Sequence, residues 1–349
     1  GADKLIETVD AFVEQTDAQT DNGSVPDACT SDWPLCSDNV TSPSSTVILP
    51  SHLLALFARR NVKVILSGEG ADELFAGYPT YIGHRVAAAY NRIPRPITRA
   101  AVRTALALTP VSMGNIGLDY LLSRFVSAAE QDLVERHHTW FGSCSPALQQ
   151  AVLGPRVLEA VAGDDPFASA RERLAGRELP DDLSRLLYMD FTMYLQDDLL
   201  TKVDRATMLA SLEARAPFLD HELAEFVAGL PSRVKLHGTT TKAILRRTVR
   251  RRLPTEILNR RKRGFNIPFS KWLLHGLGGE LRQRFAAERV EARGLFNPAG
   301  IAGLLDEHLA QRADHRKPLF TLLAFDLWCD ATFGEGARVP LAETTETSP

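Results

Sequence analysis

The chain has 349 residues, of which 44% are hydrophobic and 24% charged, and its formal net charge is -3. This composition is typical of a globular protein with one large or two ordinary domains, and the near-neutral charge argues against nucleic acid as a general partner. The lack of an 18-residue apolar run argues against a membrane span, and the first residues resemble neither a signal nor a transit peptide. We therefore expect a cytoplasmic protein, whose four scattered cysteines stay free thiols.

Two different segments open the chain. Apolar residues recur at helical spacing in residues 1–15, which predicts an amphipathic helix. Residues 16–43 are rich in Asp, Thr, Ser, Asn and Pro and show almost no periodic apolar pattern, so we expect an atypical polar insertion or a disordered segment. Helical spacing returns from Val47 to Arg60 and leads directly into an apolar run.

The segment 62–78, VKVILSGEGADELFAGY, carries the strongest functional pattern. Its apolar, β-branched start predicts a buried parallel strand, and a glycine-bearing turn after such a strand is where α/β proteins bind phosphates. Three carboxylates lie within five residues of this turn, and their repulsion requires a cation, a proton or a basic side chain: Glu69, Asp72 and Glu73. A turn of this kind is also common as a plain connection, so the wider context has to decide.

Residues 84–230 are predicted to form helix after helix, separated by prolines, the longest from about Asp181 to Leu212. On this helix three aspartates recur every seven residues and are expected to share one face: Asp190, Asp197 and Asp204. Asp198 stands four residues before Lys202, a spacing that fits ion pairs on a solvated face or a functional stripe.

A strongly basic stretch follows between residues 233 and 263, where twelve lysines and arginines stand against the single acid Glu256. Such a cluster could neutralise nucleic acid or nucleotide phosphates, but it lacks the interleaved aromatic residues of a stacking platform. We interpret it as phosphate neutralisation or plain solvation. The last helix is expected to end at about Phe333, before a flexible tail over residues 334–349.

Four blocks stand in order in this chain: ILSGEGADELFAGY (65–78), YLQDDLLTKVDRATMLASLEARAPFLDH (194–221), TTTKAILRR (239–247) and RRKRGFNIPFSKWL (260–273). Together they resemble the synthetase domain of glutamine-hydrolysing asparagine synthetases and their relatives, including β-lactam synthetases. The resemblance covers about residues 44–333. It implies an α/β fold with predominantly helical content, in which a truncated parallel sheet of the adenine-nucleotide α-hydrolase type (PP-loop ATP pyrophosphatase) adjoins a large helical region.

The resemblance also implies a reaction. Aspartate is activated with ATP and Mg²⁺ as an aspartyl-adenylate, and ammonia, free or derived from glutamine, then forms asparagine. By this resemblance Ser67 and Gly68 contact ATP, and Asp72 is a magnesium ligand. Glu69 and Lys242 take the catalytic positions. The resemblance also implies that a further set of residues forms the wall of the pocket or structural ion pairs: Glu73, Asp198, Lys202, Asp204, Arg205, Arg215 and Arg263.

Two parts of the family pattern are absent from the sequence. Position 1 is glycine, where the family's N-terminal glutaminase domain needs its cysteine nucleophile, and no SGGxDS phosphate loop occurs. We therefore expect the C-terminal part of a longer enzyme, with low or no activity alone, acting as a homo-oligomer or with a glutaminase domain supplied elsewhere. The alternatives are a family member that amidates or cyclises another substrate, as β-lactam synthetases do, and a non-catalytic helical partner protein.

Overall fold

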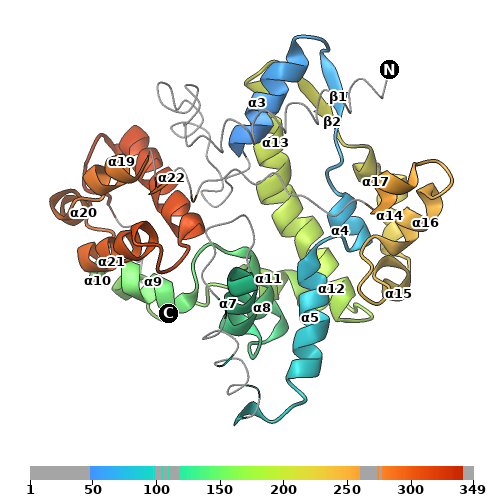
Figure 1. Cartoon of the computed structure of the whole chain (residues 1–349), viewed down its shortest axis with the longest axis horizontal. Helices are drawn as coiled ribbons and strands as arrows, with labels where there is room; N and C mark the ends of the chain where they lie inside the picture. The colour runs from blue at the N-terminus through green and yellow to red at the C-terminus, as the bar shows by residue number, and fades with distance from the viewer. Residues whose placement is uncertain are drawn as a thin grey trace, which may run out of the picture.

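The computed structural model describes residues 48–96, 98, 104, 109, 118–259, 270, 273–274 and 277–340. This part of the chain is predominantly helical with one small parallel sheet, which confirms the predicted α/β class (Figure 1). The predicted segments 1–15 and 16–43 lie outside the described residues. Within the described ranges, no helix is both long and apolar enough to cross a bilayer.

The elements follow one another in four groups along the chain. The first contains α3 (Ile48–Arg59), β1 (Val64–Leu66), α4 (Ala71–Phe75) and α5 (Pro79–Tyr90). The second contains α7 (Leu118–Ala128), α8 (Leu133–Phe141), α9 (Pro146–Val152), α10 (Pro155–Ala160), α11 (Ala168–Leu174), α12 (Asp182–Met189), η2 (Asp190–Leu200) and α13 (Thr201–Met208). The third contains β2 (Glu213–Arg215), η3 (Pro217–Leu219), α14 (His221–Ala228), α15 (Ser232–Lys235), α16 (Ala243–Val249) and α17 (Thr255–Asn259). The fourth contains α19 (Leu277–Arg284), α20 (Ala287–Arg293), α21 (Pro298–Leu309) and α22 (Arg316–Phe333).

A long rod made of α12, η2 and α13 runs through the middle of the molecule (Figure 1). Helix α3 packs along α13, and α4 contacts both η2 and α12. Helices α14 to α17 lie on one side of the rod, whereas α19 to α22 lie on the other side, next to α9 and α10 (Figure 1). Helix α22 ends at Phe333, as the sequence predicts.

Strands β1 and β2 pair in parallel, with Val64 opposite Glu213 and Leu66 opposite Arg215. Ile65 points to the covered face, where it packs against a small core of α3 and the residues just before β2. The other face is open, because the side chains of Val64 and Leu66 are 48% and 76% exposed. The prediction of a parallel strand is therefore confirmed, but the prediction that this strand is buried is wrong for the structure described.

The middle of the rod is a π-helix, η2, between two α-helices. A π-helix bonds each residue to the fifth along, so its side chains leave the register of an α-helix. The expectation that Asp190, Asp197 and Asp204 share one face is wrong for this reason. Asp190 is buried, whereas Asp197 and Asp204 are exposed.

The C-terminal helices are tied together by a buried ionic cluster. Its members are two aspartates of α22 and three arginines of α19 and α20: Asp326, Asp330, Arg284, Arg289 and Arg293. The Nη1 atom of Arg284 lies 2.8 Å from Asp326 Oδ2 and 2.7 Å from Asp330 Oδ2. Arg293, only 1% exposed, contacts both aspartates. Because removing one partner would leave buried charge uncompensated, the cluster holds the three helices in fixed relative positions.

The same cluster anchors the chain after α22. The backbone N–H of Gly336 donates to Asp330 Oδ1 at 3.0 Å, and the N–H of Val339 donates to the carbonyl of Arg293 at 3.3 Å. Val339 is buried with Leu295 and Cys329. Residues 334–340 thus pack on the C-terminal helices, and the predicted flexibility of residues 341–349 falls outside the described part.

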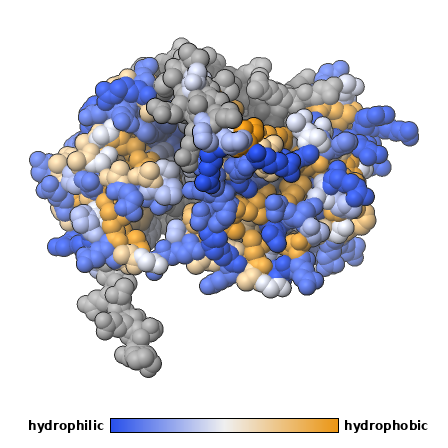
Figure 2. Space-filling model, turned by 90° about the horizontal axis from the view of Figure 1, so that it is seen from below, coloured by the Kyte–Doolittle hydropathy of each residue, from blue (hydrophilic) through white to orange (hydrophobic). Residues whose placement is uncertain are grey.

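Two larger hydrophobic cores support these parts. One joins α19 to α22 with α9 and α13, and the other joins α5, α8 and α11 to α12. On the face shown in Figure 2, apolar residues form narrow patches between hydrophilic ones. Both cores include a part of the rod, α13 in the first and α12 in the second.

Candidate functional site

The turn after β1 extends the parallel pairing and then opens. The N–H of Ser67 donates to the carbonyl of Arg215 at 2.7 Å. Gly70 has φ +84°, and a Cβ there would lie 2.2 Å from Leu219, so glycine is required for both backbone and space. A Cβ at Gly68 would meet no described atom within 4 Å. Among the described residues the space beside the Gly68 backbone is therefore open, and a ligand could approach the main chain there.

Helix α4 begins immediately after this turn, and Lys242 faces it from the start of α16. Lys242 Nζ lies 3.1 Å from Asp72 Oδ1, and the Lys242 N–H donates to the carbonyl of Phe75 at 3.1 Å. Lys242 has φ +51°, an unusual conformation for a residue with a side chain. The pair occupies the space beside Gly77, because a Cβ there would lie 1.8 Å from Asp72 Oδ1 and 2.3 Å from Lys242 Cε. The predicted magnesium ligand and the predicted catalytic lysine thus form one ion pair.

The predicted base Glu69 interacts with the same groups and with Lys202. Burial raises the pKa of Glu69, the positive charges of Lys202 and Lys242 act in the opposite direction, and the negative charge of Asp72 raises it further. Lys202 is buried on α13, and burial lowers its pKa against the attraction of Asp198, Glu69 and Glu73. A carboxylate with a raised pKa is a stronger proton acceptor than an ordinary carboxylate, which suits the role of a general base.

Glu73 lies on the buried side of α4 and accepts a hydrogen bond from the hydroxyl of Tyr78. Burial raises the pKa of Glu73 to about 7, against the effect of the Tyr78 hydrogen bond. Burial and the nearby Glu73 carboxylate also raise the pKa of the Tyr78 hydroxyl, which stays protonated and therefore donates. Glu73 is thus the carboxyl group of α4 that titrates near neutral pH.

A buried polar chain runs behind the site, from α5 and α8 to the π-helix. Arg136 Nε donates to His84 Nδ1 at 3.0 Å, and His84 Nε2 lies 3.1 Å from His137 Nδ1. His137 Nε2 lies 2.7 Å from Asp190 Oδ1, and the Tyr81 hydroxyl donates to Asp190 Oδ2 at 2.5 Å. Because Nδ1 of His84 accepts from Arg136, its Nε2 carries the proton and His137 in turn donates to Asp190. Burial lowers the pKa of His84 to about 2, so it is neutral.

No sequence pattern predicts this chain, because Tyr81 and Asp190 are 109 positions apart. The chain fixes the start of the π-helix against α5, which directly follows Tyr78. Sequence reasoning also missed Tyr78 as the partner of Glu73, although both belong to the ILSGEGADELFAGY block. The alternation of small and aromatic residues after α4 is the only signal that could have drawn attention to it.

The remaining predicted residues have different surroundings. Asp204 is exposed on α13, and Arg205 is half-buried beside it. Arg215, at the end of β2, is exposed and pairs with Glu213. Arg263 lies outside the described residues. The structure therefore brings together the residues of α4 with Asp198, Lys202 and Lys242, and leaves Asp204 and Arg215 facing solvent.

The candidate magnesium position can be compared with what the ion requires. Within the described residues, no group of three or more His, Cys, Asp or Glu side chains forms a metal cluster. Mg²⁺ usually binds through one or two carboxylates and completes its shell with water and substrate phosphates. A single half-buried carboxylate such as Asp72, beside an open turn, fits that mode. Asp72 could therefore hold Mg²⁺ together with phosphate oxygens and water.

An open glycine turn at the carboxyl end of a parallel strand, with carboxylates and a lysine converging on it, is typical of nucleotide-dependent α/β enzymes. Comparison with known proteins agrees. The family model described as asparagine synthase matches residues 15–330, a range that includes the polar segment 16–43. The chain therefore belongs to the asparagine synthase family, and its architecture is consistent with an adenine-nucleotide α-hydrolase-like fold.

Individual relatives support this assignment. A putative glutamine-hydrolysing asparagine synthetase of Mycobacterium tuberculosis is 35% identical over 295 residues, covering 84% of this chain and 43% of the relative. Asparagine synthetase 1 of Bacillus subtilis is 27% identical over 290 residues, covering 80% of this chain and 42% of the relative. Amidase chyE of Penicillium rubens is 27% identical over 254 residues, covering 68% and 37%. The chain spans less than half the length of these relatives.

Proposed function

We propose that this chain carries the synthetase site of an ATP-dependent, amide-forming enzyme of the asparagine synthetase type. In the proposed reaction a carboxylate oxygen of aspartate attacks the α-phosphorus of ATP, and pyrophosphate leaves. Ammonia, free or derived from glutamine, then attacks the activated carbonyl carbon, and AMP leaves as asparagine forms. The observation that carries the proposal is the Lys242–Asp72 pair beside the open turn at the end of β1.

The residues around the turn and α4 would have different roles in this reaction. The open backbone of Ser67 and Gly68 would lie against the nucleotide, since no described atom fills that space. Lys242 is held close to α4 by its backbone hydrogen bond to Phe75, and its ammonium would offset the negative charge that develops on the leaving pyrophosphate. Glu69, whose pKa is raised by burial, would accept a proton from the attacking ammonia.

Asp72 would hold Mg²⁺ jointly with the phosphates. When bound there, the ion would supply positive charge for the triphosphate oxygens. Asp72 already has Lys242 as a partner at 3.1 Å, so its carboxylate is oriented before any ligand arrives. This orientation of the carboxylate supports a preformed binding site for a phosphate-bearing substrate.

We also propose that this site is incomplete and that the chain has low or no activity alone. The sequence contains no SGGxDS phosphate loop. The sheet has two strands among the described residues, and its Val64–Leu66 face is exposed. Open apolar strands of this kind are usually covered in α/β proteins, so further strands and a phosphate loop would complete both the sheet and the site.

The test is to measure the melting temperature of the chain with Mg-ATP, and the release of AMP with aspartate and ammonium added. We expect Mg-ATP to raise the melting temperature, and Lys242→Ala to reduce that rise. Glu69→Gln should keep nucleotide binding, because its role is proton transfer. AMP release that Glu69→Gln abolishes would support the function and contradict the low activity of the chain alone. No effect of Mg-ATP on melting would contradict the proposed function itself and favour a non-catalytic helical partner.

A second candidate is a synthetase of the same family with another acceptor. It is favoured by the similarity to amidase chyE and to amidase chry2 of Gibberella zeae, the latter 23% identical over 238 residues. In this case AMP release would depend on an acid other than aspartate. A screen of carboxylic acids for AMP release, with Glu69→Gln as the inactive control, separates the two candidates.

A further inference from the structure

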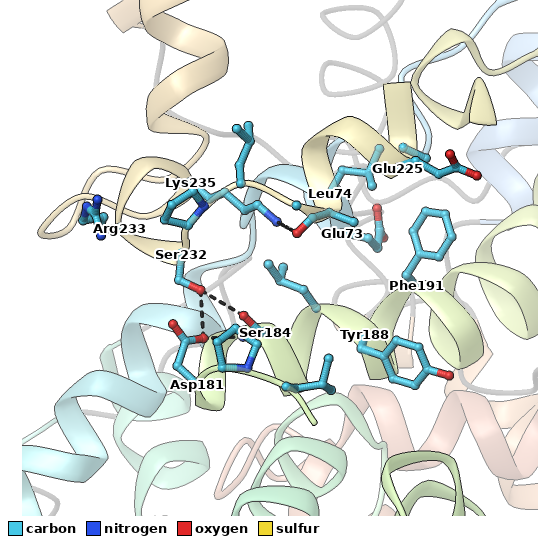
Figure 3. Close-up of a pocket in the computed structure, with 18 residues that line it drawn as sticks. Glu73, Leu74, Asp181, Ser184, Tyr188, Phe191, Glu225, Ser232, Arg233 and Lys235 are labelled. Atoms are coloured by element: carbon cyan, nitrogen blue, oxygen red, sulfur yellow. Dashed lines mark hydrogen bonds between the residues drawn. The ribbon is translucent and has the colours of Figure 1, made fainter. Parts of the chain in front are cut away.

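A large cavity of the described structure lies away from the open turn, on the other side of α4. It has a volume of about 780 Å³ and is enclosed by α4, the end of α12 with the start of η2, and α14 with α15 (Figure 3). Small-molecule pockets usually have volumes of about 300–1,000 Å³ and mostly apolar walls. The walls here are mostly apolar as well, with Leu74, Leu187, Phe191 and Leu230 among them.

One charged group inside this pocket has unused bonding capacity. Lys235 is only 5% exposed, and within the described structure its ammonium has one hydrogen bond, to the carbonyl of Ala228 at 3.3 Å. An ammonium group carries three donors, so two remain for a ligand. Figure 3 shows the Lys235 side chain extending from α15 toward the part of the pocket where Leu74 lies. Burial lowers the pKa of Lys235, whereas the negative charge of Asp181 acts in the opposite direction.

The acidic groups of the pocket are already engaged. Asp181 Oδ1 accepts from the N–H of Ser184 and from the hydroxyl of Ser232, both at 2.8 Å, and so caps α12. Glu73 accepts from a tyrosine hydroxyl. Glu225 lies at the edge of the pocket in Figure 3, with its carboxylate directed outward. The group that can still form hydrogen bonds is therefore cationic, and the surface around it is apolar.

We propose that this pocket binds a small carboxylic acid with an apolar body, whose carboxylate pairs with Lys235 while the body lies against Leu74, Leu187 and Phe191. A carboxylate would use the remaining donors of Lys235 and neutralise a buried charge. The site is separate from the Ser67–Gly68 turn and does not depend on the proposed reaction. It shares a wall, α4, with the Lys242–Asp72 pair.

The test is calorimetric titration of the whole chain with 3-phenylpropionate, and with 3-phenylpropan-1-ol as a probe of the same shape without charge. We expect saturable binding of the acid at one site and at least tenfold weaker binding of the alcohol. Lys235→Met should weaken the acid at least tenfold and leave the alcohol unchanged. Lys63→Met, at an exposed lysine before β1, is the matched control and should change neither.

A second variant keeps the test independent of the folding of Lys235→Met. Ala228 lines the pocket with an exposed side chain at the end of α14, so Ala228→Phe adds bulk at the pocket with little risk to the core. We expect this variant to weaken the acid and the alcohol alike. Equal binding of the acid by the wild type, Lys235→Met and Ala228→Phe would overturn the proposal, and so would the absence of saturable binding to the wild type.

Discussion

Replacing Glu73 by glutamine should change how the stability of this protein depends on pH. Burial raises the pKa of Glu73 from 4.5 to about 7 in the folded state. Between these two values the folded protein keeps a proton that the unfolded chain has lost, so the free energy of unfolding falls as the pH rises. This stabilisation is fully present below pH 4.5 and is lost by the time the pH has risen through 7. Because one pH unit corresponds to about 1.36 kcal/mol, the loss between pH 5 and pH 8 is about 2–3 kcal/mol.

Glutamine keeps an acceptor for the hydroxyl of Tyr78 but cannot ionise. Glu73→Gln should therefore stabilise the protein relative to the wild type by about 2–3 kcal/mol more at pH 8 than at pH 5. The measurement is urea unfolding at both pH values, followed by circular dichroism. Glu225→Gln, at an exposed position, is the matched control and should show no such difference. An equal effect of Glu73→Gln at the two pH values would refute the reasoning.

Three further predictions concern stability and the ion pair at the turn. Tyr81→Phe removes a hydrogen bond to a buried carboxylate and should lower the free energy of unfolding by about 2 kcal/mol. Tyr90→Phe is the control, because the Tyr90 hydroxyl has no partner among the described residues, and it should cost less than about 0.5 kcal/mol. Similar costs for the two variants would contradict the role of the Tyr81 hydroxyl in the buried polar chain. Asp330→Asn removes one of the two aspartates that the three arginines of the buried ionic cluster share, and it should lower the free energy of unfolding by about 3–5 kcal/mol. Asp306→Asn, in an exposed ion pair, is the control and should lower it by less than about 1 kcal/mol when both variants are unfolded with urea. Gly77→Ala displaces the flexible ends of Asp72 and Lys242. The melting temperature without ligand should therefore change little, but its rise with Mg-ATP should be lost. An unchanged rise would show that nucleotide binding does not need the Asp72–Lys242 pair.

The sequence predicted the local features of the site because they are encoded in short segments. A β-branched run followed by glycines is sufficient to predict the strand and turn at 64–70, whereas the helix α4 that carries Asp72 and Glu73 was not predicted. The family resemblance gave Asp72 and Lys242 separate roles, and their pairing was not predicted, because the two residues are 170 positions apart. Local periodicity carries no information about contacts over such distances.

Other features could not be predicted for physical reasons. The heptad spacing of Asp190, Asp197 and Asp204 implies a common face only if the helix is α throughout, and the π-helix removes that condition. The pocket above α12 is formed by loops and short helices whose relative positions depend on tertiary packing. The exposure of Leu66 contradicts its apolar character, since a hydrophobic run indicates burial without identifying the covering element.

The π-helix lets side chains from the two halves of one continuous rod point to different parts of the molecule. At its start Asp190 bonds to His137 of α8 and Tyr81 of α5, and just after its end Lys202 lies near the carboxylates of Asp198, Glu69 and Glu73. A π-helical segment corresponds to residues inserted into an α-helix. The twist of η2 therefore sets the angle between Asp190, which faces α5 and α8, and Lys202, which faces the turn before α4. Changing the number of residues in this segment would change that angle, whereas replacing an exposed side chain within it would not.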